Sequence, residues 1–274
     1  MDFSRLILTD RKYNFHSHTQ FCDGRATMAI FAQEAVAAGF SHYGFSPHSP
    51  IPIESPANML STDVEPYLKE VWRLQELFCD APTRFYAAME VDYLGPNWGP
   101  SSSYFKSLPL DYRIGSVHFI PSQNGELHDI DGSFASFTKR LNDYFKGDLH
   151  YVVNTFFDQS LEMVSRRGFD IIGHYDKVGH NASHIQPGIE QEDWFIDRIN
   201  ELTDAIISSG VAVEINTKAR AVHGRFFPSE IHWRKLLDAG VTILVNSDAH
   251  YHDLINASRD EAFKIIEQIK TQNG

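Results

Sequence analysis

Seven short apolar segments alternate with longer amphipathic segments along this chain, and this alternation limits its fold more than any other feature. The short segments are typical of buried strands, and the long ones have the apolar spacing of helices that pack on one face. The expected strands are Tyr13–His18, Tyr43–Ser46, Phe85–Val91, Tyr112–His118, Asp170–Gly173, Val211–Asn216 and Val241–Asn246. The expected helices are Thr27–Ala38, Asp63–Phe78, Phe134–Phe145, Asp148–Arg167, Glu190–Ser209, Ser229–Ala239 and Ser258–Lys270. Because strands that alternate with helices form parallel βαβ units, the sequence predicts an α/β fold.

Seven strands in 274 residues favour a closed or nearly closed (β/α)7 barrel of the TIM-barrel type. A doubly wound open sheet is the alternative. We expect one domain over residues 1–274, because no linker, repeat or low-complexity segment divides the chain. Tyr93–Leu110 is expected to be a loop with room for one helical turn, and Asn124–Ser133 a surface loop. A polar loop that carries His180 and His184 is expected before the helix at Glu190.

Polar side chains stand at the ends of the expected strands. In βα barrels the C-terminal ends of the strands carry the active site. From the first strand to the last, the residues there are His16 and His18 with Asp23, His48, Glu90, His118, His174, Glu214 with Asn216, and Asp248 with His250. His16 and His18 are two residues apart, so their side chains lie on the same side of a strand. One histidine at a strand end is more often structural, but the repetition at every strand end favours a metal site.

The composition limits what such a site could act on. A formal net charge of −12 argues against binding of nucleic acids or anionic membranes. We also find no basic groove with interleaved aromatic residues, no signal peptide and no apolar run long enough to span a bilayer. The two cysteines, Cys22 and Cys79, do not suggest a disulfide scaffold, so a cytoplasmic location is expected. The sequence leaves a homo-oligomer open.

The strand-end residues resemble the motifs of the polymerase and histidinol phosphatase (PHP) family, over nearly the whole chain from about Tyr13 to the last helix. The motifs are His16-Ser17-His18-Thr19 with Asp23-Gly24, His48, Glu90, His118, His174 and Asp248-Ala249-His250. Three stretches resemble the histidinol-phosphatase branch more closely: Ser46–Pro50, Ile114–Ile120, and Glu214–Thr217 followed by Pro228-Ser229. The family fold is a distorted seven-stranded barrel, which agrees with the strand count.

The resemblance implies three divalent cations (zinc, iron or manganese) at one phosphoesterase site. Carried over to this chain, the ligands are His16, His18, Glu90 and Asp248 for the first metal, Glu90, His118 and His174 for the second, and Asp23, His48 and His250 for the third. Some relatives have histidine where this chain has Asp23, which leaves the metal preference of the third site open. Glu90 and Asp248 would be catalytic through the metals they hold, with a hydroxide that bridges two metals as the nucleophile.

Basic residues near the strand ends are candidates for binding the substrate. Arg220 and Arg225 follow the sixth strand, and arginine suits bidentate contact with phosphate. Lys177 comes soon after the fifth strand and is a further candidate. His223 lies in the same segment as the two arginines and is a candidate general acid for the leaving alkoxide.

We therefore expect a metal-dependent phosphomonoesterase that acts on a small phosphorylated substrate. The branch resemblance favours a histidinol-phosphate phosphatase of histidine biosynthesis, which converts L-histidinol phosphate and water to L-histidinol and phosphate. Glu54 and Asp92 are candidates for binding the amine of that substrate. Two alternatives stay open: a phosphatase for another small phosphate, such as a nucleotide or sugar phosphate, and a non-catalytic metal-binding domain.

Overall fold

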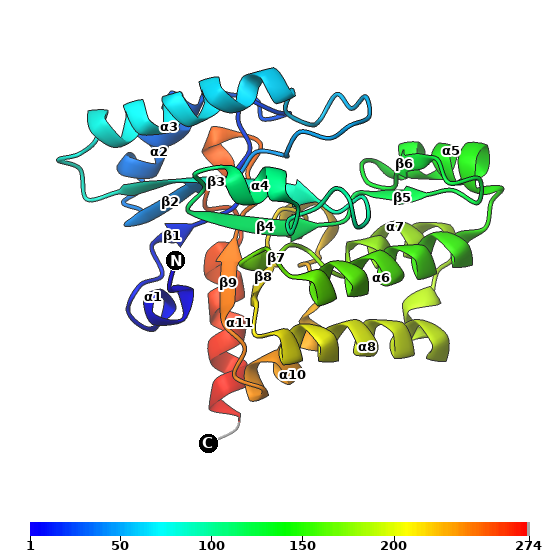
Figure 1. The fold of residues 1–274 in the computed structure, drawn as a ribbon. Coiled ribbons are helices and arrows are strands. Elements are labelled where there is room, and N and C mark those ends of the chain that lie inside the picture. Colours follow the sequence, from blue (N-terminus) through cyan, green and yellow to red (C-terminus); the bar gives the residue numbers. More distant parts are fainter. Residues whose placement is uncertain (273–274) are drawn as a thin grey trace.

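The main sheet consists of seven parallel strands in the order β1-β2-β3-β4-β7-β8-β9 in a computed structural model that describes residues 1–272 (Figure 1). Their bounds are β1 Tyr13–Asn14, β2 His42–Phe45, β3 Arg84–Asp92, β4 Tyr112–Ser116, β7 Ile171–Ile172, β8 Ala212–Asn216 and β9 Ile243–Asn246. Neighbouring strands in this order pair in parallel. The predicted α/β barrel is confirmed; most strands are shorter than the sequence indicated, whereas β3 is longer and β2 has the expected length.

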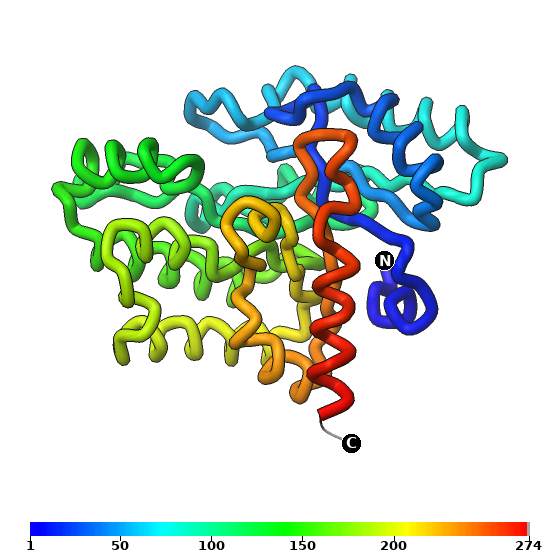
Figure 2. The backbone as a smooth tube through the Cα atoms, turned by 180° about the vertical axis from the view of Figure 1, so that it is seen from behind, coloured from blue at the N-terminus to red at the C-terminus, as the bar shows by residue number. Residues whose placement is uncertain are grey.

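Helices surround this sheet. They are α1 Phe3–Thr9, α2 Met28–Ala37, α3 Val64–Leu77, α4 Ser103–Ser107, α5 Phe134–Phe145, α6 Leu149–Arg166, α7 Lys177–Ile185, α8 Asp193–Ser209, α9 Arg220–His223, α10 Trp233–Asp238 and α11 Arg259–Thr271. Helices α2 and α3 cover β2 and β3, whereas α6 and α8 pack together on the other side of the barrel (Figure 1). Seen from behind, α11 runs down the middle of the molecule (Figure 2). Among residues 1–272, none of the helices has both the length and the apolar character needed to cross a bilayer.

The barrel closes between its first and last strands through a seam of side chains. The seam has only one bridge in the described chain, Ser17 with Ala249, beyond the ends of β1 and β9. Elsewhere the Asn246 side chain accepts a hydrogen bond from the Phe15 amide at 2.9 Å, and the Asn14 amide group donates to the Ser247 hydroxyl at 2.8 Å. The barrel is therefore nearly closed, and polar side chains substitute for part of a strand ladder.

Apolar side chains fill the N-terminal end of the barrel. Phe15 packs against Tyr112 with ring centroids 5.5 Å apart, and Phe3 of α1 contacts both rings edge-on at 5.0 and 5.6 Å. Helix α1, which the sequence analysis did not predict, thus plugs this end of the barrel. Because the apolar side chains gather here, the buried polar ones are left to the opposite end.

Two segments expected to be loops are partly regular. The stretch 124–133 contains β6 (Leu127–Asp129), which pairs antiparallel with β5 (Phe119–Pro121) in a hairpin outside the barrel. The prediction of a polar loop around His180 and His184 is wrong, because both residues lie in α7. Val178 and Ala182 are buried four residues apart, which gives α7 the apolar face of a packed helix that its polar composition obscured.

Candidate metal centre

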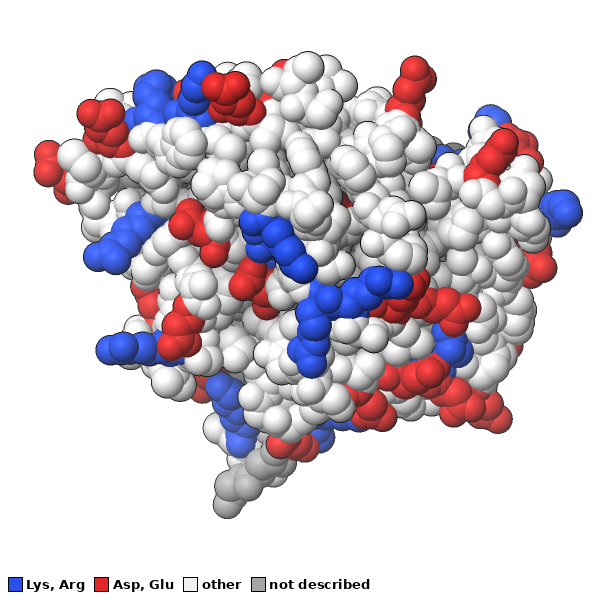
Figure 3. Space-filling model, viewed as in Figure 1, with Lys and Arg blue, Asp and Glu red and all other residues white. Residues whose placement is uncertain are grey.

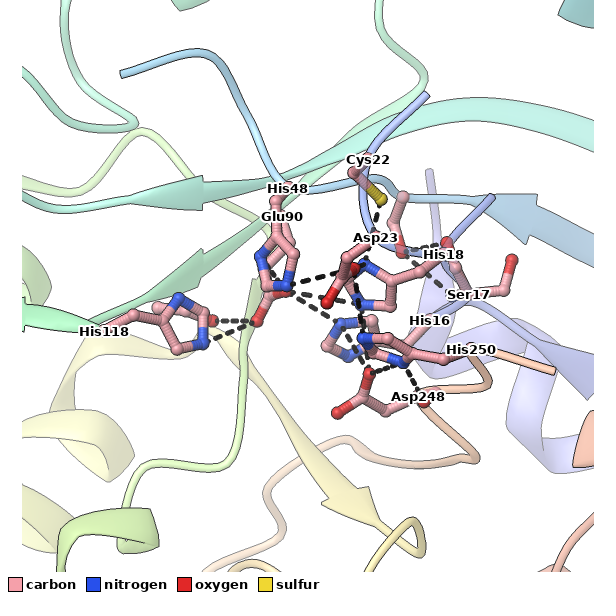
Figure 4. Close-up of polar contacts among 12 residues, drawn as sticks. His16, Ser17, His18, Cys22, Asp23, His48, Glu90, His118, Asp248 and His250 are labelled. Atoms are coloured by element: carbon pink, nitrogen blue, oxygen red, sulfur yellow. Dashed lines mark hydrogen bonds and ion pairs between the residues drawn. The ribbon is translucent and has the colours of Figure 1, made fainter. Parts of the chain in front are cut away.

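The predicted ligands converge at the C-terminal end of the barrel, as Figure 4 shows for most of them. Each follows a strand or stands in one: His16 and His18 follow β1, His48 follows β2, Glu90 lies in β3, His118 follows β4, His174 follows β7, and Asp248 and His250 follow β9. Asp23 comes from the turn after His18. Parallel strands end at the same edge of the sheet, so residues that are far apart in the sequence meet there.

Glu90 lies at the middle of the group. Its Oε2 is 3.0 Å from His48 Nδ1, 3.2 Å from His16 Nε2 and 3.5 Å from His18 Nε2. Burial alone would raise the pKa of Glu90, but the neighbouring histidines outweigh burial and lower this pKa well below its ordinary value. The carboxylate is therefore ionised among imidazoles.

The other oxygen of the Glu90 carboxylate faces a second pair of imidazoles. Oε1 is 2.8 Å from His174 Nε2 and 3.5 Å from His118 Nε2. The Ser116 hydroxyl donates to the same oxygen at 2.8 Å. With histidines on both of its oxygens, Glu90 has the placement of a bridging ligand.

Two further carboxylates complete the group on the side of β9. Asp248 Oδ1 is 3.0 Å from His18 Nε2 and 3.4 Å from His250 Nδ1. Asp23 Oδ1 is 3.2 Å from His250 Nε2 and 3.8 Å from His48 Nε2. Asp248 has a backbone φ of 47°, a left-handed conformation that aspartate adopts more readily than most residues.

Several of these buried atoms have no hydrogen-bond partner among residues 1–272. They are His16 Nε2, His18 Nε2, Asp23 Oδ1, His48 Nδ1 and Glu90 Oε2. Buried polar atoms are normally paired, and leaving them unpaired is costly. Nitrogen and carboxylate oxygen are the donors that zinc, iron and manganese accept, so the residues fit bound cations.

The ligand atoms fall into three groups, each with atoms within 4.8 Å of one another: His18, Asp23, His48 and His250; His16, His18 and Asp248; and His48, Glu90 and His118. These groups resemble the three expected ligand sets but do not match them. His18 belongs to two of them, and His48 lies beside Glu90 as well as Asp23. His174 joins through its contact with Glu90.

Outer carboxylates fix two of the histidine rings. His16 Nδ1 donates to Glu214 Oε1 at 2.7 Å, and His118 Nδ1 donates to Asp92 Oδ1 at 2.7 Å. Each hydrogen bond leaves Nε2 free to face Glu90, an arrangement common around metal-binding histidines. Asp92, a candidate for the substrate amine, is thus occupied with His118. Sequence reasoning missed this role, although Asp92 is only two residues beyond Glu90 and on the same side of β3.

A cavity of about 210 Å³ opens over the candidate ligands, and two lysines line it. Lys177 Nζ is 2.5 Å from Asp131 Oδ2, and Lys218 Nζ is 3.2 Å from His250 Nε2. Burial alone would lower the pKa of Lys177, but Asp131 and Asp248 raise it above its ordinary value, so Lys177 carries a charge at neutral pH. Lys218 was missed by the sequence analysis, although it follows β8 directly.

The two arginines expected to bind phosphate lie elsewhere. Arg225 is 2.8 Å from Asp176 Oδ2 and 2.7 Å from Glu190 Oε1, and it is not among the residues that line the cavity. Arg220 contacts Glu261 and is 3.2 Å from Glu230. Asp176, Glu190 and Glu261 come from distant segments, which is why the sequence did not reveal that both side chains are already paired.

His223 and Glu54 also lie outside the cavity. His223, the expected general acid, lines a neighbouring hollow with His180 instead. Glu54 lines a separate surface depression with Pro52 and Leu60.

Comparisons with known proteins agree with this geometry. The model of the PHP domain family matches residues 14–218. A Deinococcus radiodurans protein named "Probable histidinol-phosphatase" is 24% identical over 266 residues, which cover 93% of this chain and 92% of that protein. A Listeria monocytogenes structure that carries the name histidinol phosphatase hisK superposes with a TM-score of 0.77 at 16% identity, over 91% of this chain and 99% of the other. The structure of a Lactococcus lactis histidinol phosphate phosphatase with zinc, L-histidinol and phosphate has a TM-score of 0.67 at 20% identity, over 94% of each chain.

Proposed function

The chain belongs to the PHP domain family, and we propose that it is a metal-dependent phosphomonoesterase that hydrolyses L-histidinol phosphate to L-histidinol and phosphate. The observation that carries the proposal is the set of buried, unpaired nitrogen and oxygen atoms around Glu90, next to a cavity that two lysines line. The names of the relatives support the substrate: one is a histidinol-phosphatase by name, and the Lactococcus lactis enzyme was solved with L-histidinol and phosphate.

We propose three divalent cations, with zinc as the first choice because the Lactococcus lactis structure contains it, and iron or manganese as alternatives. Their ligands would be His16, His18, Asp23, His48, Glu90, His118, His174, Asp248 and His250. Cations held there would supply a water of lowered pKa as the nucleophile and positive charge for the phosphate oxygens.

The chain's own side chains have separate tasks in this proposal. Glu214 and Asp92 hold the rings of His16 and His118 in the orientation that points Nε2 at Glu90. Lys177 and Lys218 are the phosphate-binding residues, since both line the cavity and an ammonium group stabilises charge on the non-bridging oxygens. Lys177 remains from the expected set, and Lys218 takes the place of the two arginines.

A small ester, rather than a nucleic acid, suits the charge of this chain. Lys and Arg side chains are interspersed with Asp and Glu on the face shown in Figure 3. With a net charge of −12, this distribution gives a long polyanion little to bind. A cytoplasmic location belongs to the proposal and is supported by the two free cysteines, Cys22 and Cys79.

Phosphate release by the purified chain tests the proposal. The protein is stripped with a chelator, reloaded separately with zinc, manganese or iron, and assayed on L-histidinol phosphate, AMP, glucose 6-phosphate and glycerol 3-phosphate. We expect L-histidinol phosphate to be hydrolysed with a kcat/KM at least about tenfold above the others, a difference of about 1.4 kcal/mol. Faster hydrolysis of AMP or glucose 6-phosphate would assign another small phosphate. No release from any ester, in protein shown to contain the metals, would indicate a non-catalytic domain.

A further inference from the structure

A second hollow, of about 410 Å³, adjoins the cavity over the candidate metal centre. The cavity and the hollow share Asp131, Gly132, Lys177 and Lys218 as lining residues. A ligand whose phosphate contacts the two lysines from the metal side therefore has the hollow directly beyond them. The hollow has about twice the volume of the cavity itself, and the proposed chemistry leaves it without a role.

Aromatic rings form one wall of this hollow. Phe134, the first residue of α5, lies 4.9 Å from the His180 ring and 5.5 Å from the His223 ring, measured between centroids. His184 supports Phe134 from another side, with the two rings parallel and 3.9 Å apart. His180 also lies 5.7 Å from Phe227. Such spacings are those of packed aromatic pairs, so a further flat ring can join them.

The imidazole at the centre of this wall is uncharged at neutral pH. Burial, and then the charges of Arg225 and His223, lower the pKa of His180 to about 4. A neutral imidazole beside phenyl rings favours a flat, weakly polar group.

We propose that the hollow lined by Phe134, His180, Val222 and His223 binds the leaving group of the substrate, and that it selects phosphate esters that carry a flat heteroaromatic ring. The inference rests on the proposed phosphomonoesterase function and identifies the residues that set its specificity. In this arrangement His223 is a ring-binding residue, in contrast to the general-acid role expected from the sequence.

Two variants alter the hollow in opposite ways. Phe134→Leu removes a ring and keeps apolar volume, whereas Val222→Trp fills the hollow from α9. Val222 is 77% exposed, so the larger side chain should not disturb the core. His150→Leu is the matched control, because His150 also contacts an aromatic ring, that of Trp194 with centroids 4.0 Å apart, but lines neither space.

Turnover is compared on L-histidinol phosphate, which has a ring, and on O-phosphoethanolamine, which has an amine and no ring. For Phe134→Leu and Val222→Trp we expect kcat/KM on L-histidinol phosphate to fall about tenfold, mainly through KM, and kcat/KM on O-phosphoethanolamine to change less than about twofold. His150→Leu should match the wild type on both. Equal losses on both esters, or no loss with either variant, would overturn the proposal.

A binding measurement separates this inference from the proposed reaction. Calorimetry on metal-loaded wild-type protein should show that L-histidinol binds at least about tenfold more tightly than ethanolamine, and that Val222→Trp abolishes the difference. This result would support the ring-binding hollow even if phosphate release assigned a different ester. Equal affinity of the wild type for the two alcohols would reject the hollow, even if L-histidinol phosphate were hydrolysed.

Discussion

The Nδ1 atom of His16 lies 2.7 Å from Oε1 of Glu214, and both side chains are completely buried. Glu214 is further fixed by Asn246, whose side-chain amide donates to the same oxygen at 3.1 Å. The His16 ring can therefore hardly rotate, and its Nε2 stays directed at Glu90. We expect Glu214→Gln to weaken zinc binding about 10- to 100-fold, because the ring loses its charged partner.

Competition with a chromophoric chelator measures this change in zinc affinity. Glu230→Gln is the control, since Glu230 is an exposed partner of Arg220 and lies outside the cavity. Activity of Glu214→Gln should recover in part at high zinc concentration. Unchanged zinc affinity in a folded Glu214→Gln protein would contradict an orienting role.

Lys218→Gln should impair substrate binding and leave the fold intact. Lys218 Nζ is 3.5 Å from Asp248 Oδ1, but its own side chain is partly exposed, and His18 Nε2 stays 3.0 Å from the same Asp248 oxygen after the substitution. We expect KM for the phosphate ester to rise about tenfold with little change in melting temperature. Lys235→Gln, at a surface pair with Asp204, is the control. A wild-type KM for Lys218→Gln would remove this residue from the phosphate site.

Arg225→Gln should lower the stability of the protein and leave substrate binding nearly unchanged, in contrast to Lys218→Gln. The substitution removes the cation that faces Asp176, whose side chain is 1% exposed, and Glu190. Breaking a buried ion pair leaves an uncompensated charge, so we expect the free energy of unfolding to fall by roughly 3 kcal/mol. Urea denaturation measures this loss. Because Arg225 does not line the cavity, KM of the folded variant should stay within about twofold of the wild type; a large rise in KM would restore the phosphate role first expected for it.

Removal of metal should lower the stability of the protein. Without cations, the unpaired atoms of His16, His18, His48 and Glu90 stay buried. A ligand present at a thousandfold excess over its Kd stabilises the folded state by about 4 kcal/mol. We therefore expect chelation to lower the melting temperature by about 5 °C or more, and stoichiometric zinc to restore it. Identical melting curves before and after chelation would argue against a metal centre.

The titration of His180 predicts a pH dependence of stability. Its pKa is about 4 in the folded protein, because of burial first and then Arg225 and His223, whereas an unfolded histidine titrates near 6.5. Between these values the unfolded state binds the proton and the folded state does not, so stability falls as the pH drops from about 6.5 to about 4. Glu190 and Lys177 also act on this ring, with opposite signs.

His180→Gln should therefore lose less stability than the wild type over this pH range. Urea denaturation of both chelated proteins at several pH values measures the two slopes, and metal release then affects neither. The same slope in both proteins would show that His180 protonates as readily in the folded state as in the unfolded one.

The strand-end residues could be predicted to meet because parallel strands bring their C-terminal ends to one edge. Glu90 and His118 illustrate this: they lie on neighbouring strands, and the apolar residues before them mark where those strands run. The rule needs only the order of strands and the position of each end. It therefore predicts which residues lie close together, but not the distances between them.

Side-chain pairing could not be predicted in the same way. Nothing in the sequence shows that Asp176 and Glu190 lie on either side of Arg225, because their contact depends on how α7 and the loop before α8 pack. The seam was hidden for the same reason: Asn14 and Asn246 look like ordinary strand residues until the first and last strands come together. Lys218 differs from these cases: it lies two residues after the end of β8, so the strand-end rule does predict its position.

The seam between β1 and β9 has a consequence for when the protein can become active. His16 and His18 stand on one edge of the seam and Asp248 on the other, more than two hundred residues later in the chain. A nascent chain that still lacks β9 would have only part of the candidate metal ligands. A cation held by residues on both edges would in turn help to keep the completed barrel closed. The site would thus be complete only once the last strand has joined the barrel, and separation of the two edges would divide its ligands between them.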